Sequence, residues 1–112
     1  MINFESLGYK NITKDKPITF IECLGEFFDS TYPYNQRFYK QEGNITTMLK
    51  VGNIHDIVLI SGICYYSKGL EKFELILPEK YIVERFEQIL NSVKQIIKNK
   101  LNYDNRTKSK SL

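Results

Sequence analysis

The chain has 112 residues, enough for one domain with its own hydrophobic core and too few for two ordinary domains. Apolar residues make up 42% and charged residues 26% of the composition, which excludes a chain that is disordered throughout. The net charge of +3 is unevenly placed, because six basic residues and one acidic residue follow residue 93, so that the first 93 residues sum to −2. The body of the domain is therefore slightly acidic and its C-terminal end is basic.

The sequence contains no sign of export or of membrane insertion. The N-terminus lacks a charged region followed by an apolar stretch, so no signal peptide is expected. The longest apolar run, residues 57–60, is far too short to cross a bilayer. We therefore expect a cytoplasmic protein without membrane contact. In that compartment Cys23 and Cys64 are interpreted as small buried apolar residues rather than as a disulfide.

The first clear element is an amphipathic helix predicted over residues 17–29, after a short strand-like stretch around Ile2 and Phe4. Pro17 suits the first turn of a helix, where its missing N–H would have no partner. Gly25 weakens the pattern, and a strand through residues 18–21 is the alternative. Apolar residues recur at helical spacing and acidic residues lie opposite them. The apolar positions are Ile18, Ile21, Leu24, Phe27 and Phe28, and the acidic ones are Glu22, Glu26 and Asp29.

Four strands are predicted next, over residues 37–40, 45–51, 57–66 and 72–77. Turn residues separate them, and short connections join neighbouring antiparallel strands, so the four should form a meander. The run 57–66 is almost entirely apolar, which is typical of a central strand. Gly62 within it indicates a bulge or the close approach of a neighbouring element.

A long C-terminal helix is predicted over residues 79–101, directly after Pro78 ends the last strand. Two adjacent rows of apolar residues make a wide stripe that should pack across the sheet. Acidic residues lie early and basic residues late, which complements the helix dipole. In the alternative arrangement, the distal residues Ile96, Ile97 and Leu101 pack against a second subunit instead of the sheet. The chain would then be a homodimer through this helix.

Together these elements predict an α+β fold in the order α-β-β-β-β-α. A four-stranded antiparallel meander would carry the N-terminal amphipathic helix and the long C-terminal helix. Residues 1–101 would form the single domain, and residues 102–112 a basic, flexible tail.

No catalytic or metal-binding pattern stands out. His55 is the one histidine, and Asp56 beside it would point to the opposite face of a strand, so a loop histidine is the simpler interpretation. One histidine and two distant cysteines match no metal-ligand spacing, and the glycines form no phosphate-binding loop. We therefore expect a protein that is not an enzyme and that uses no cofactor or metal.

Two groups of residues are candidate partner-binding surfaces. Tyrosine and arginine are enriched at protein interfaces, and an acidic helix face suits a basic partner. The competing interpretations are tyrosines that cover the edges of the core and carboxylates that form a solvent face. The first group is Tyr32, Tyr34, Arg37 and Tyr39, and the second is Glu22, Glu26 and Asp29.

These observations predict a small protein-binding module, specifically an inhibitor or an immunity or anti-defence-type protein that occludes a macromolecular target. A basic nuclease or toxin would suit the acidic body. The alternative is a nucleic-acid-binding regulatory protein that uses the basic tail and the sheet tyrosines, and it predicts a strong salt dependence of binding. The acidic body and the lack of a known nucleic-acid-binding motif favour the first hypothesis.

Overall fold

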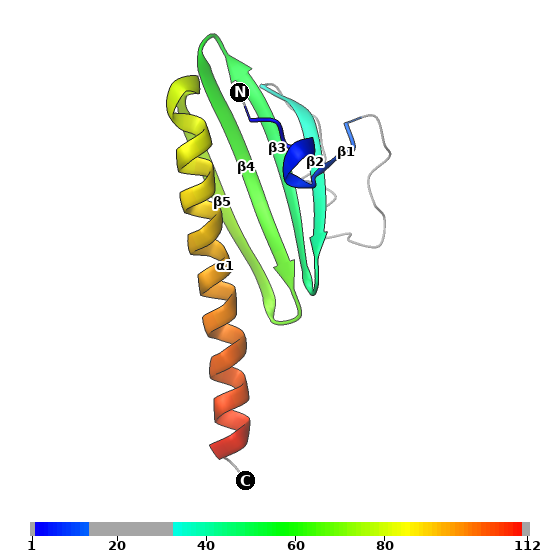
Figure 1. Ribbon diagram of the computed structural model, residues 1–112, viewed down its shortest axis with the longest axis vertical. Helices are drawn as coiled ribbons and strands as arrows, with labels where there is room; N and C mark the ends of the chain where they lie inside the picture. Colours follow the sequence, from blue (N-terminus) through cyan, green and yellow to red (C-terminus); the bar gives the residue numbers. More distant parts are fainter. Residues whose placement is uncertain (1, 14–32, 111–112) are drawn as a thin grey trace.

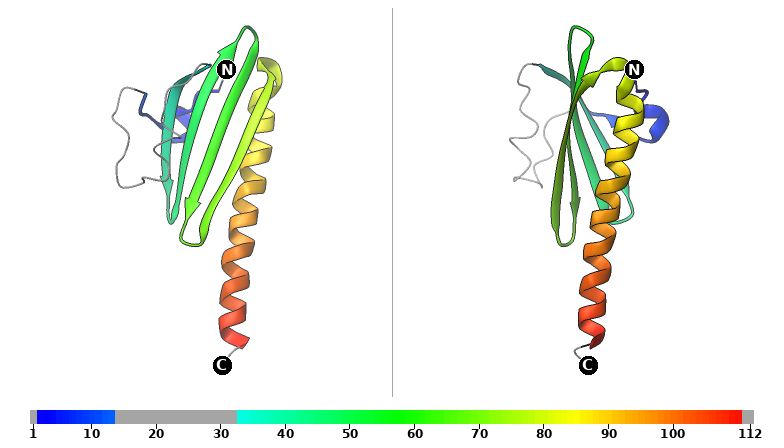
Figure 2. Two further views of the ribbon diagram at one scale, coloured as in Figure 1. Left: turned by 180° about the vertical axis from the view of Figure 1, so that it is seen from behind. Right: turned by 90° about the vertical axis from the view of Figure 1, so that its left-hand side faces the viewer.

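The computed structural model describes residues 2–13 and 33–110, with side chains as far as residue 102 (Figure 1). One antiparallel sheet in the order β1-β2-β3-β4-β5 carries a long helix, α1, on one face, where α1 lies over β5 more than over β4 (Figure 2). No helix in the described residues is long and apolar enough to span a membrane. The elements are the 3-10 turn η1 (Glu5–Leu7), the strands β1 (Lys10–Asn11), β2 (Tyr34–Glu42), β3 (Ile45–Ile54), β4 (Ile57–Tyr66) and β5 (Gly69–Pro78), and α1 (Glu79–Lys110).

The α+β class and the antiparallel meander are confirmed, but the predicted number of strands is wrong. The sheet has five strands, because Lys10 and Asn11 form β1 and pair with Tyr39 and Phe38 of β2. A strand of two residues is too short to carry an alternating pattern, so its sequence does not reveal it. The stretch around Ile2 and Phe4 is not a strand; Phe4 precedes the 3-10 turn η1, which is followed by Gly8 with a φ of 93°. The predicted helix over residues 17–29 lies outside the described residues.

The C-terminal helix is confirmed and is longer than predicted, since α1 continues from Glu79 to Lys110. No glycine or proline interrupts residues 79–110, so nothing in the backbone ends the helix earlier. The helix therefore extends into the residues predicted as a basic tail, 102–112, and the domain boundary there stays a prediction. Its last turns run past the end of the sheet (Figure 1).

Strand register divides the side chains between a helix side and a second face of the sheet. Phe38 pairs with Leu49, Val51 with Ile60 and Gly62 with Phe73, and the side chains of this set form the core beneath α1. Residues one position away point to the second face because side chains alternate along a strand. On β5 the second-face residues are Leu70, Lys72, Glu74 and Ile76.

Phe86 of α1 is the centre of the core and is almost fully buried. Its ring meets Phe4, Tyr9 and Phe73 edge-on, at centroid distances of 5.4, 6.3 and 6.5 Å. Edge-to-face aromatic pairs add to the hydrophobic stabilisation from burial. One ring of α1 therefore joins the N-terminal residues, the helix and β5. The row that continues this contact along α1 is Ile82, Phe86, Val93 and Ile97.

Gly62 makes room for the ring of Phe73. The two residues are direct partners across β4 and β5, and a Cβ atom built on Gly62 would lie 2.1 Å from Cζ of Phe73. The close approach that the glycine predicted is therefore confirmed, and the approaching element is an aromatic side chain of the next strand.

Ion pairs fasten the middle of α1 to the far end of the sheet. Lys94 Nζ lies 2.9 Å from Glu42 Oε2, and Lys40 contacts the same carboxylate. Lys100 Nζ lies 2.5 Å from Glu71 Oε1, which also accepts a hydrogen bond of 3.0 Å from the Tyr66 hydroxyl. These donors hold the pKa of both carboxyl groups below its usual value, chiefly through Lys40 for Glu42 and through Lys100 for Glu71.

Substitution of Gly62 by alanine should lower the free energy of unfolding by about 1–3 kcal/mol, because the added methyl group overpacks the core against Phe73. Urea denaturation measures the change. In a Phe73→Leu background the same substitution should cost less, because the aromatic ring that it strikes is gone. An equal cost in both backgrounds would show that the glycine is needed for another reason.

Stability should fall as the pH drops through and below about 4.5, the ordinary pKa of a glutamate. Glu42 and Glu71 have lowered pKa values in the folded state. As the pH falls, the unfolded state therefore binds protons first and is stabilised relative to the folded state. Urea denaturation at a series of pH values checks this. Because both ion pairs are partly exposed to solvent, the fall should be modest. Glu71→Gln should flatten the curve, whereas an unchanged curve would contradict a role for this ion pair.

Candidate binding groove

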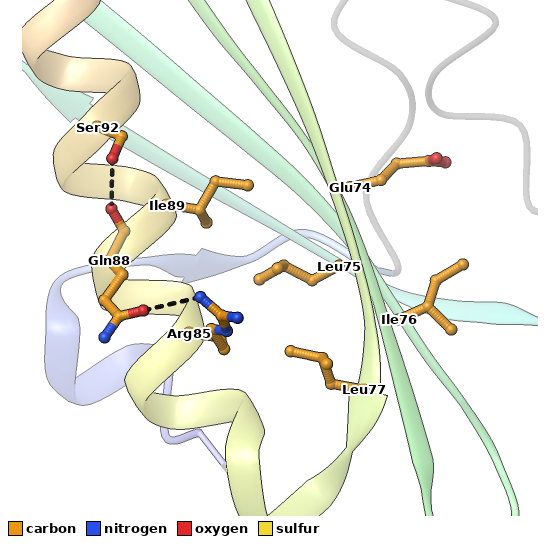
Figure 3. Close-up of a pocket in the computed structure, with 8 residues that line it drawn as sticks. All are labelled: Glu74, Leu75, Ile76, Leu77, Arg85, Gln88, Ile89 and Ser92. Carbon is orange, nitrogen blue, oxygen red and sulfur yellow. Dashed lines mark hydrogen bonds between the residues drawn. The ribbon is translucent and has the colours of Figure 1, made fainter.

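A groove runs between α1 and the outer edge of β5 (Figure 3). Its volume is about 520 Å³, within the usual range of ligand sites. A neighbouring hollow of about 320 Å³ shares three of its residues and continues it along α1 to Tyr81 and Glu84. The main groove is lined by Glu74, Leu75, Ile76 and Leu77 of β5 and by Arg85, Gln88, Ile89 and Ser92 of α1.

Helical spacing explains why α1 serves the core and the groove at once. Residues 81, 85, 88 and 92 follow one another at intervals of three or four, and residue 84 lies three after 81 and four before 88, so all five share one side of the helix. The core row that contains Ile82 and Phe86 lies on the adjacent side, against the sheet. The groove is therefore built by the part of α1 that faces the edge of β5.

The floor of the groove is apolar. Leu75 and Leu77 are partly buried side chains on the helix side of β5, and Ile89 of α1 points toward them (Figure 3). Glu74 and Ile76 point the other way, to the second face, and 61% of Ile76 is exposed to solvent. A ligand at this edge would meet aliphatic side chains on both faces of the sheet.

The rim of the groove is polar and includes one cation. Arg85 Nη1 donates to Gln88 Oε1 at 3.2 Å, and Gln88 Nε2 donates to Glu84 Oε1 at 3.4 Å. The Ser92 hydroxyl donates to the Gln88 carbonyl at 3.0 Å. Within the described part of the chain Arg85 forms no ion pair. Its guanidinium therefore has donors to offer to an anionic group of a ligand.

The backbone of β5 offers hydrogen-bonding groups at the same edge. Glu79 N donates to the Asp56 carbonyl at 2.9 Å, so residues 56 and 79 form a hydrogen-bonded pair that continues the β4–β5 register. Such pairs alternate with non-hydrogen-bonded pairs in an antiparallel ladder. The backbone groups that point away from β4 are therefore those of the even-numbered residues, among them Lys72, Glu74 and Ile76. No strand in the described residues lies beyond this edge.

Three of the predicted partner-binding residues lie together on β2, on the second face of the sheet. Tyr34 has Lys50 Nζ 5.3 Å from its ring centre, and burial is the main reason that its pKa is raised. Arg37 Nη2 donates to the Thr13 carbonyl at 2.7 Å, and the Tyr39 hydroxyl donates to Gln41 at 3.2 Å. Arg37 thus fastens the N-terminal segment to β2.

The remaining predicted partner-binding residues, Tyr32, Glu22, Glu26 and Asp29, lie outside the described residues. The groove residues were not predicted as a site. Arg85, Gln88 and Ser92 recur at helical spacing beside the apolar stripe of α1. That spacing was the sequence pattern from which a shared polar side of the helix could have been predicted.

The other chemistry-bearing residues lie apart from the groove. His55 is exposed in the turn between β3 and β4, with a φ of 55°. Cys64 is a buried free thiol 3.5 Å from the Thr47 hydroxyl, and burial raises its pKa, so it is the small buried residue that was predicted. Cys23 lies outside the described residues. Residues 2–13 and 33–102 contain no cluster of three or more potential metal ligands.

Comparison with protein-family models, with curated proteins and with solved structures found no match for the chain. A fold alone does not determine a function, so the function has to be argued from the geometry and chemistry of the groove.

Proposed function

We propose that this protein is a protein-binding module that receives a segment of its partner in the groove between α1 and β5. The observation that supports this most is the combination of an apolar floor, Leu75, Leu77 and Ile89, with the polar rim around Arg85. Binding sites are commonly apolar hollows in which a few polar groups orient the ligand.

The charges of the groove favour a protein partner over a nucleic acid. Arg85 is the one cation among the described residues that line the main groove. Glu84 lines the neighbouring hollow, and Glu74 lies on the β5 edge with its side chain on the second face. Nucleic-acid binding depends largely on the neutralisation of several phosphates by lysine and arginine. A groove with this balance suits a polypeptide of mixed charge.

We further propose that binding occludes the partner, as an inhibitor or an immunity or anti-defence-type protein does. A segment in this groove would be enclosed between α1 and the edge of the sheet. Groups of the partner that face the groove would then be shielded from their own substrate or receptor.

Gln88→Trp should fill the groove and reduce partner recovery at least tenfold, whereas Asn91→Trp should leave recovery unchanged. Both positions are exposed on α1, and Asn91 does not line the groove. The measurement is quantitative affinity purification from nuclease-treated lysate of the organism that carries the gene. Thermal unfolding followed by circular dichroism controls for folding.

Equal recovery by the two variants would refute the groove as the binding site. Recovery that disappears with nuclease treatment would instead support a nucleic-acid ligand.

A further inference from the structure

We infer that the partner segment binds in extended form, as an additional strand paired with β5, and that its residues alternate between the groove and the second face. This inference rests on the proposed function and specifies how the groove is used. It depends on the juxtaposition of an open strand edge with an apolar groove.

The open edge offers a regular row of backbone donors and acceptors. Lys72, Glu74 and Ile76 each direct an N–H and a carbonyl group away from β4, as the Glu79–Asp56 hydrogen bond establishes. Alternate residues of a strand are roughly 6.6 Å apart, which is the repeat that an added strand requires. Pro78, at the next outward-facing position, has no N–H, so the row ends there. Main-chain pairing with such an edge is an established mode of peptide recognition.

Side-chain alternation predicts what the partner segment contains. Every second side chain would enter the groove and meet Leu75, Leu77 and Ile89, so these positions should be aliphatic or aromatic. The residue nearest Arg85 should be acidic, because this guanidinium forms no ion pair within the described residues.

The intervening side chains of the partner would lie on the second face beside those of β5. An apolar residue would cover Ile76, of which 61% is exposed. A basic residue would suit the position next to Glu74, and an acidic residue the position next to Lys72. The expected ligand is therefore an extended segment of mixed charge with apolar residues at every second position.

A second copy of this chain fits the edge less well. If β5 paired antiparallel with the β5 of another copy, both helices would lie on the same side of the joined sheet. Because α1 lies over β5, the two helices would then cover adjacent strands, roughly 5 Å apart. Packed helices need about 8–10 Å between their axes. A segment without its own covering helix avoids this clash.

Amide hydrogen exchange, measured by NMR, tests the edge and its occupation. In the free protein the amides of Lys72, Glu74 and Ile76 should exchange much faster than those of Phe73 and Leu75, which bond to β4. The probe is a peptide selected from a phage-displayed library of random twelve-residue peptides, with counter-selection against Gln88→Trp. When it binds, the three fast amides should slow at least tenfold.

The same peptide carries a second test. N-methylation of one alternate set of its residues should weaken binding at least tenfold, and methylation of the other set should change it less than threefold, because only one set bonds to β5. On the protein, Ile76→Pro should weaken binding at least tenfold and Ile76→Thr much less. The proline removes an outward N–H and leaves the bonds to β4 in place.

Each outcome has a distinct meaning. Slowed exchange at the three amides, together with a one-sided effect of N-methylation, would support strand addition. A selected peptide that needs the groove but leaves these amides fast would overturn strand addition and leave the proposed function standing. A library that yields no peptide dependent on the groove, or a protein that elutes as a dimer with these amides already protected, would overturn the inference and the groove as a free site.

Discussion

The packing of Phe86 against the sheet is the contact on which the rest of the structure depends. Its ring touches Phe4, Tyr9 and Phe73, so it joins the N-terminal residues, the helix and β5 in one core. With this side of α1 held down, the neighbouring side is turned toward the edge of β5. The groove follows from the same packing, because the residues at helical spacing from Arg85 to Ser92 then line it opposite β5. Core and candidate site are two sides of one helix.

Much of the fold could be predicted from local sequence patterns, and the differences between prediction and structure have local causes. The apolar run of β4, the turns that flank it and the two apolar rows of α1 are strong periodic signals, and the structure contains the elements that they predict. The two residues of β1 are a strand only because β2 is available to pair with them. Gly62 indicated that a neighbouring element comes close to β4, but it did not identify that element as the ring of Phe73.

The candidate site was less predictable, because it is a property of the assembled elements. Tyr34, Arg37 and Tyr39 are close in sequence and do lie on one face of β2, yet the guanidinium of Arg37 is committed to the Thr13 carbonyl. The groove combines β5 with residues of α1 up to 18 positions away, counted from Glu74 to Ser92. The helix begins where the last strand ends, and no local sequence pattern indicates that it folds back beside the free edge of that strand. Only the position of β5 as the last strand makes the groove possible.

The direct passage from β5 into α1 fixes where the helix begins. Glu79 follows Pro78 without a loop, and its amide is hydrogen-bonded to the Asp56 carbonyl, so the start of the helix is held at the end of the sheet. The groove lies near this start of the helix, and the last turns of α1 run past the other end of the sheet (Figure 1). From residue 89 to residue 110 the helix is roughly 32 Å long. The ion pairs of Lys94 and Lys100 hold the helix to the sheet beyond the groove, so the basic turns that follow them project past the sheet from a fixed base.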